Sequence, residues 1–338
     1  MNSKPPAAEA EGRRAVGGRS VPGSVSSAPF EDPLAQALQA RIVQAIEQAG
    51  GWLAFDRFMA MALVEPGLGY YARGAPTFGL DPADGSDFAT APEMSPLFGQ
   101  ALARQVAEAL ACGAPPVLTE FGGGSGALAD ALLPALECLG GSGVAPTYRI
   151  VEVSAALRGR QQRRLERFGS RVQWLDALPG ALDGVVLGNE VLDAMPVTLL
   201  HWDGAQWFER GVGVAPAEVP QAGPVFRFAD RPSPLRPPVE GPFVPGTTVE
   251  LQPQGQAFAA TVAQRLQKGL AIFIDYGFPE SEYYHPQRIG GTLMCHRQHR
   301  SDADPLCNVG QKDITAHVDF TGIALAAQSG GCEVLGYT

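Results

Sequence analysis

The sequence of 338 residues has few cysteines and no long apolar run. Its five cysteines are odd in number and none stands in a C-x-x-C pair, which excludes a disulfide framework and a cysteine-based zinc site and is typical of a reducing compartment. We therefore expect no bound metal. No stretch reaches the roughly 18 consecutive apolar residues of a transmembrane helix, so we expect no insertion into a membrane.

Positive charge is also scarce. The chain carries 25 Lys+Arg against 35 Asp+Glu, a net charge of −10. A protein that binds nucleic acid presents a basic surface, so we expect no nucleic-acid partner; the acidic balance instead fits a cationic substrate or ligand. Hydrophobic residues make up 45% of the chain, enough for a folded core, and 41 glycines with 29 prolines predict long loops.

The N-terminal third is predicted to consist of a tail followed by a helical region. Residues 1–30 have no apolar core behind basic residues, so we expect no secretory signal and interpret them as a disordered tail. This tail favours a bacterial cytoplasm, with the mitochondrial matrix as the alternative location. Residues 31–112 are predicted to form a helical region, with helices at 33–50, 55–64 and 96–112 and an aromatic-rich loop at 66–95.

Strands and helices alternate in the remainder, 113–338. Apolar runs predict strands at 117–121, 148–153, 171–175, 184–189 and 269–277, separated by helical segments. Such alternation predicts an α/β fold in which helices cover both faces of a parallel sheet. Residues 197–250 break the alternation, and the run VTLLHWDGAQWFERGV within them predicts a β-hairpin in an insertion after the fourth strand.

A glycine-rich loop follows the first of these strands. It contains Gly122, Gly124 and Gly126, preceded by Glu120. Glycines allow a tight turn and let a ligand approach the backbone, at the sheet edge where α/β proteins bind ligands. The spacing also satisfies a dinucleotide pattern, but a carboxylate would repel a pyrophosphate. Glu120 suits the ammonium and sulfonium of S-adenosyl-L-methionine (SAM), so the loop favours SAM over a dinucleotide.

Acidic residues also follow the next strands. Glu152 ends the second strand, where a carboxylate can bind both ribose hydroxyls of a nucleoside, and Asp176 follows the third, where an adenine amino group could be bound. Asn189, Glu190 and Asp193 follow the fourth strand. Two acids beside a reactive centre require a cation or hydrogen-bond donors, and a planar guanidinium matches paired carboxylate oxygens. Their structural alternatives are helix caps or turn acids.

These segments together resemble the MidA-like proteins, which include the arginine methyltransferase that assists assembly of mitochondrial respiratory complex I. The resemblance covers residues 33–338 and rests on these groups: Pro66, Gly69, Tyr70 and Tyr71; Asp87, Phe88, Thr90, Ala91, Pro92, Glu93 and Ser95; the Glu120 loop; Asn189, Glu190, Asp193, Ala194, Pro196 and Val197; Asp275, Tyr276 and Gly277; Gly291, Thr292 and Leu293; and Asp313 through Phe320. One departure is His296, where the family usually has tyrosine.

The resemblance implies a Rossmann-like class I SAM-dependent methyltransferase that acts on an arginine of a 49-kDa-type subunit of complex I. It places SAM against Glu120, the glycines, Glu152, Asp176 and Asn189. Glu190, with Asp193 or Glu93, would orient the guanidinium, and Tyr70, Tyr71 and His317 would lie on the substrate side. The segment CEVLGY would be the sixth strand of this fold, but its ladder partner is the seventh, so we expect either that the chain continues beyond Thr338 or that this end is unpaired and mobile. Two alternatives stay open: an NAD(P)-linked oxidoreductase, and a non-catalytic complex I assembly or interaction protein.

Overall fold

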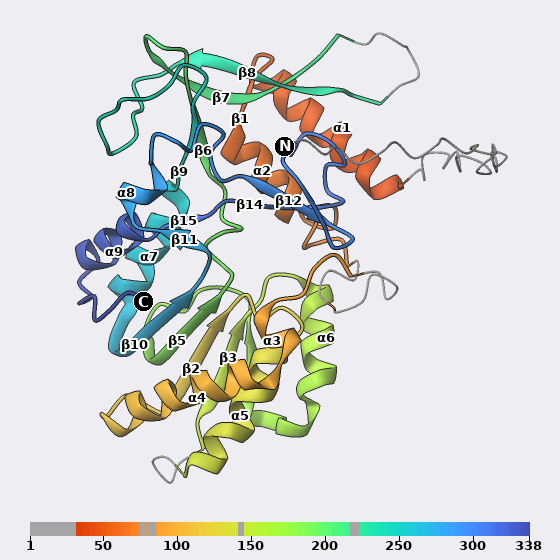
Figure 1. The fold of residues 1–338 in the computed structure, drawn as a ribbon. Helices are drawn as coiled ribbons and strands as arrows, with labels where there is room; N and C mark the ends of the chain where they lie inside the picture. Colours follow the sequence, from red (N-terminus) through yellow and green to blue (C-terminus); the bar gives the residue numbers. More distant parts are fainter. Residues whose placement is uncertain (1–31, 75–78, 80–85, 141–144, 217–222) are drawn as a thin grey trace, which may run out of the picture. The chain divides into compact units, whose positions relative to one another are not determined.

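A five-stranded parallel sheet forms the centre of the α/β fold (Figure 1). The computed structural model describes residues 32–74, 79, 86–140, 145–216 and 223–338; the predicted tail, 1–30, lies outside them. The strand order is β10–β5–β2–β3–β4, and every neighbouring pair is parallel. The strands are β2 (Val117–Phe121), β3 (Thr147–Val151), β4 (Val172–Leu175), β5 (Leu182–Asn189) and β10 (Leu266–Ile274).

Helices cover both faces of this sheet because its strands alternate their apolar side chains between two cores. Leu118 of β2 and Leu187 of β5 face one core, which α4 and α5 complete, whereas Phe121 and Val186 face the other, which α7 completes. The predicted α/β class is therefore confirmed. The helices are α4 (Pro96–Ala111), α5 (Ala127–Leu139), α6 (Ala155–Leu165, continued by the 3-10 helix η2, Glu166–Arg171) and α7 (Pro253–Arg265).

A second, antiparallel sheet draws on distant parts of the chain. β6 and β7 form a hairpin through residues 203–206. β9 pairs with β6, and β8 pairs with β7. The two-residue strand β1 then pairs with β7, so a segment before the parallel sheet joins a segment after its fourth strand. The strands are β1 (Leu53–Ala54), β6 (Thr198–Trp202), β7 (Trp207–Val214), β8 (Phe226–Pro232) and β9 (Thr248–Leu251).

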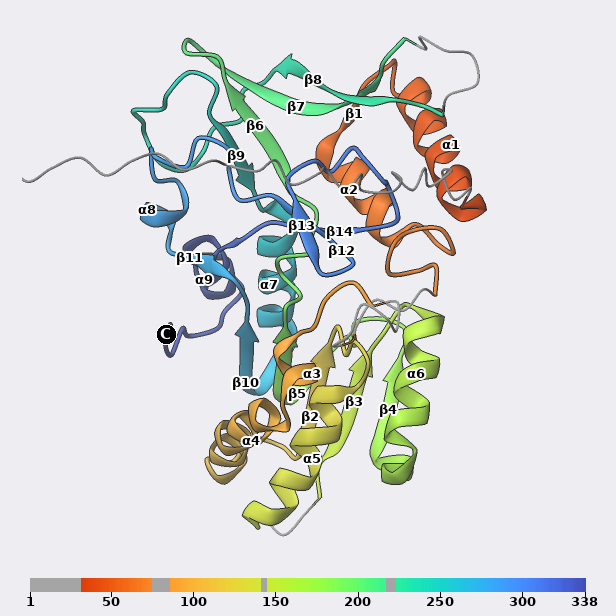
Figure 2. The ribbon, with the colours of Figure 1, turned by 45° about the vertical axis from the view of Figure 1, so that its right-hand side comes forward.

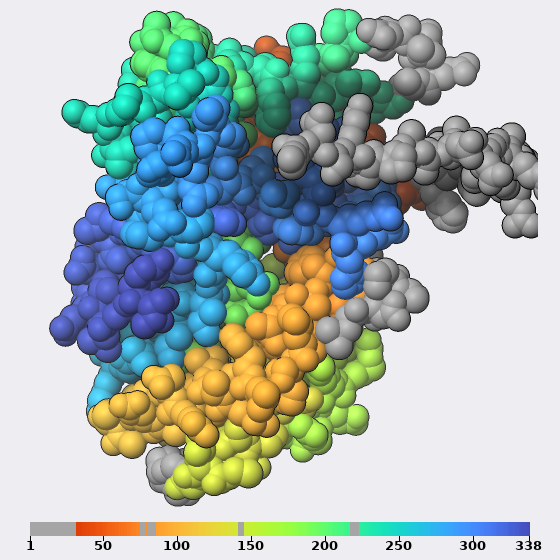
Figure 3. Space-filling model, in the orientation of Figure 1, coloured from red at the N-terminus to blue at the C-terminus, as the bar shows by residue number. Residues whose placement is uncertain are grey.

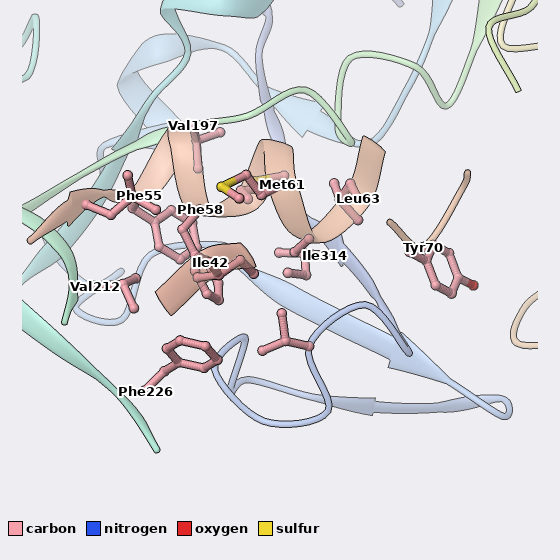
Figure 4. Close-up of a cluster of buried hydrophobic side chains, with 14 of the residues drawn as sticks. Ile42, Phe55, Phe58, Met61, Leu63, Tyr70, Val197, Val212, Phe226 and Ile314 are labelled. Carbon is pink, nitrogen blue, oxygen red and sulfur yellow. The ribbon is translucent and has the colours of Figure 1, made fainter. Parts of the chain in front are cut away.

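The first two helices pack on the antiparallel sheet rather than on the parallel one. Helix α1 (Pro33–Gln48) and helix α2 (Phe55–Val64) contribute Ile42 and Phe58 to a core that also contains Val212 of β7 and Ile314 (Figure 4). Because α4 belongs to the core of the parallel sheet, the predicted helical region 31–112 contacts both sheets. The connection between α2 and α4 therefore crosses from one sheet to the other.

Short elements complete the fold (Figure 2). Helix α3 lies within the predicted loop 66–95, of which residues 75–78 and 80–85 are outside the described part. Residues 332–337 form no strand and pair with no neighbour, as expected for an unpaired end, and β10 is an edge of the parallel sheet. Among the described residues, no helix is long and apolar enough to span a membrane. The short elements are α3 (Ala91–Met94), β11 (Gly277–Phe278), α8 (Glu280–Tyr283), β12 (Met294–Arg297), β13 (Arg300–Asp302), β14 (Asp313–Thr315), β15 (Val318–Asp319) and α9 (Phe320–Ser329).

Candidate active site

The glycine loop and the turn after β5 meet at the carboxyl edge of the parallel sheet. Gly122 has φ +65°, and a Cβ on it would lie 2.9 Å from Cγ2 of Val191, so only glycine fits between the two strand ends. Gly126 has φ +88° and begins α5. In Figure 3 the turn after β5, in green, lies in a hollow between the orange α3–α4 region and the blue residues that follow β10.

Glu120 lies beneath this loop and is buried. Its Oε2 accepts a hydrogen bond of 2.9 Å from the hydroxyl of Tyr148 on β3, and only 2% of the residue is exposed. Burial raises the pKa of Glu120 to about 7, and the charge of Glu152 adds to the shift. The two predicted carboxylates are therefore close enough to interact across neighbouring strand ends.

Glu152 is held by two donors. Its Oε1 accepts from the backbone N–H of Ser154 (2.8 Å) and its Oε2 from the side-chain amide of Gln161 (2.9 Å). Burial raises the pKa of Glu152 and these two hydrogen bonds oppose that shift. Gln161 was not among the site residues predicted from the sequence, although its position one turn from both Leu157 and Leu165, on the buried side of the helix, is a signal that could have identified it.

Two other predicted cofactor residues lie nearer to solvent. The side chain of Asp176 is 88% exposed and forms an ion pair of 2.5 Å with Arg158 of α6. Asn189 ends β5 and donates from its side-chain amide to Oε1 of Glu190 at 3.3 Å. Both residues lie at the carboxyl edge of the parallel sheet, as predicted. Asp176 accepts from Arg158, and Asn189 donates to Glu190.

Glu190 occupies a strained position in the turn after β5. Its φ of 50° lies in the left-handed region, which costs a non-glycine residue about 1 kcal/mol or more. Burial raises the pKa of Glu190, although hydrogen bonds from Asn189 and from the backbone of Ala91 oppose the shift. Helix α3 therefore contacts the carboxylate that is predicted to act in catalysis.

The turn that carries Glu190 is capped by an aspartate from β10's end. One oxygen of Asp275 accepts backbone hydrogen bonds from the three consecutive residues 191–193, at 2.8–3.3 Å. Asp193 is 8% exposed, and burial raises its pKa well above the usual range, with the charges of Asp275, Asp313 and Glu190 acting in the same direction. Several acids thus share one small region.

Two tyrosine–aspartate pairs border the same region. The hydroxyl of Tyr70 donates to Asp87 and that of Tyr71 to Asp313, each at 2.8 Å. Burial raises the pKa of Asp313 to about 7, and the hydrogen bond from Tyr71 opposes the shift. Asp275 and Asp313 were part of the motifs that carried the family resemblance, but local sequence gave no indication that their charges act on Glu190 and Asp193.

Glu93 and His317 have partners away from the carboxylates. Glu93 accepts a hydrogen bond from the hydroxyl of Ser125 and pairs with Arg164 at 3.4 Å, so α3 is held to the glycine loop. The ring of His317 packs on Phe278, with ring centroids 5.2 Å apart. The structure brings Glu190 and Asp193 together, places Glu93 beside the cofactor loop, and turns the His317 ring toward β11.

This edge fits SAM on its own chemistry. The chain offers the buried carboxylates of Glu120 and Glu152 for a cation, beside a tight bend whose glycines let the backbone pack closely on the neighbouring turn. The residues present therefore match a ligand that carries an ammonium and a sulfonium.

Comparisons with known proteins agree. The family model described as "Putative S-adenosyl-L-methionine-dependent methyltransferase" matches residues 101–338. A crystal structure from Burkholderia thailandensis, of a protein described as a "likely methyl transferase" and bound to S-adenosyl-homocysteine, is 47% identical with a TM-score of 0.84, and the match covers 92% of this chain and 81% of that one. A native crystal structure from the same organism is 45% identical with a TM-score of 0.79, covering 92% and 80%.

Among curated relatives, the Drosophila melanogaster protein named "Protein arginine methyltransferase NDUFAF7 homolog, mitochondrial" is 28% identical over 330 residues, which cover 88% of this chain and 70% of that protein. The Caenorhabditis elegans protein of the same name is 26% identical over 306 residues, which cover 81% and 68%. The resemblance to MidA-like proteins is thus confirmed. The chain belongs to this family of SAM-dependent methyltransferases, and SAM is its cofactor.

Proposed function

We propose that this methyltransferase transfers the methyl group to the guanidinium of an arginine in a protein. The observation that carries the proposal is a group of acids at and near the turn after β5: the partly buried Glu190 and the buried Asp193 and Asp313, whose pKa values are raised by burial and by the charges of neighbouring acids. Such a group costs free energy unless it meets a cation, and a guanidinium supplies both a permanent charge and paired donors. The name of the Drosophila relative supports the same substrate class.

The finer parts of the proposal rest on the family resemblance. We propose a Rossmann-like class I methyltransferase fold with the β6–β7 hairpin inserted, and a 49-kDa-type subunit of complex I as the protein substrate. Glu120, Gly122, Gly124, Gly126 and Glu152 would hold SAM, with Asp176 toward the adenine. The dinucleotide alternative loses its support because the family model is one of SAM-dependent enzymes.

The chain's own residues then supply alignment and charge. Bound SAM provides a methyl group on a positively charged sulfur. Glu190 and Asp193 orient the guanidinium so that one nitrogen faces the cofactor loop, and a carboxylate oxygen of Glu190 accepts the proton that this nitrogen loses. Helix α3, held to the loop by Glu93, covers this edge of the sheet and limits access of water.

The experiment measures transfer of labelled methyl from SAM to the 49-kDa-type subunit, with the modified residue identified by mass spectrometry. Glu190→Gln keeps the shape of the side chain and should lower kcat roughly 100-fold or more, whereas the exposed Glu166→Gln should leave it unchanged. Methylation of a residue other than arginine would refute the substrate class. Binding of S-adenosyl-homocysteine without any transfer would instead support the non-catalytic alternative.

A further inference from the structure

Gln161 is a fully buried polar side chain in an otherwise apolar position. It is 0% exposed on α6, and the helix buries Leu157 and Leu165 one turn before and after it. A buried amide without hydrogen-bond partners would destabilise the fold. The partners of the Gln161 amide therefore indicate the role of this residue.

All of its bonds reach the proposed cofactor site or the strand next to it. The amide nitrogen Nε2 donates to the carbonyl of Gly124 (3.0 Å) and to Oε2 of Glu152 (2.9 Å), while Oε1 accepts from the indole of Trp174 (2.9 Å). The orientation is fixed by chemistry: a reversed amide would place its oxygen against two acceptors and its nitrogen against a donor.

This one side chain therefore joins the glycine loop, the end of β3 and strand β4. With the backbone of Ser154 on Oε1 and Gln161 on Oε2, the Glu152 carboxylate is held at both oxygens. A carboxylate oxygen has a further lone pair, so each can still accept from a ribose hydroxyl. The donors also favour the charged form that such acceptance needs.

We infer that Gln161 is a positioning residue for the cofactor ribose, which holds the Glu152 carboxylate in register with the glycine loop. The inference rests on the proposed cofactor site and does not depend on which substrate is methylated.

The test is calorimetric binding of S-adenosyl-homocysteine and of its 2′,3′-dideoxyribose analogue to the full chain. Gln161→Met keeps the side-chain length and removes both donors. It should weaken binding of S-adenosyl-homocysteine about 10- to 100-fold, the range for a lost hydrogen bond to a charged group, and weaken the analogue much less. The neighbouring Gln162→Met is the control, because Gln162 is exposed on the same helix.

A second variant guards against a folding defect. Gln161→Asn keeps an amide and buries no new charge, but it is one methylene too short to reach Glu152 and Gly124, so it should show the same selective loss. An equal loss for both ligands, or no loss in a folded variant, would overturn the inference and assign Gln161 a structural role only. Failure of the unaltered protein to bind S-adenosyl-homocysteine would refute the proposed cofactor site itself.

Discussion

Glu120→Gln should make the protein more stable at pH 8 and weaken its binding of SAM. The side chain is 2% exposed, and its shape and its hydrogen bond from Tyr148 can be retained by an amide. What the substitution removes is a buried negative charge. We therefore expect stability and cofactor affinity to change in opposite directions, which a general packing defect would not produce.

The magnitude follows from the pKa. Raising the carboxyl pKa from 4.5 to about 7 disfavours the ionised form in the folded protein by about 3 kcal/mol. Between these two values the folded state holds the proton more tightly than the unfolded state, so the free energy of unfolding falls as the pH rises through this window. The variant lacks this contribution, and its advantage over the unaltered protein should grow from nearly zero near pH 4 to a few kcal/mol at pH 8.

Urea unfolding at several pH values and calorimetry with S-adenosyl-homocysteine would measure both effects. Glu47→Gln, at an exposed glutamate of α1, is the matched control. Because other acids such as Asp313 titrate in the same range, the relevant quantity is the difference between variant and parent. A variant that is less stable than its parent at pH 8, or that binds the ligand equally well, would contradict this account of Glu120.

Two further substitutions test the bend and its neighbouring turn. Gly122→Ala should lower stability by about 1–2 kcal/mol and affinity for S-adenosyl-homocysteine at least tenfold, because position 122 has φ +65° and the new Cβ would clash with Val191. Gly180→Ala, at a position with open space around it, is the control and should change neither quantity when binding is measured by calorimetry. Asp275→Ala should lower the free energy of unfolding in urea by about 2 kcal/mol, because the backbone amides of residues 191–193 lose their acceptor. Asp275→Asn keeps a side-chain oxygen as acceptor, so an alanine variant that loses no more stability than the asparagine variant would show that this cap contributes little.

Local pattern predicted the parts of the fold that depend on local sequence. The strand 117–121 and the helix 55–64 are observed with the predicted bounds, because an apolar run and an amphipathic period are each set within a few residues. The glycine loop was located for the same reason: its backbone conformation restricts the residue type directly. The class of the fold and the edge that carries the site could therefore be predicted.

The remaining features depend on contacts between distant residues. Tyr71 and Asp313 are separated by 242 positions, and no pattern near either one indicates the other. The two-residue strand β1 exists only because β7 offers it a ladder. The unpaired segment 332–337 illustrates the same dependence, because its apolar run has strand character but no neighbouring strand with which to pair.

The shared core of α1 and α2 has a consequence for synthesis on the ribosome. Ile42 and Phe58 pack with Ile314, so these helices are synthesised more than 250 residues before this partner. At roughly 5–20 residues per second, this delay is on the order of ten to fifty seconds. The apolar faces of these helices stay without this partner throughout that interval, so they are expected to bind a chaperone. A truncation before Ile314 would likewise leave the core of α1 and α2 incomplete.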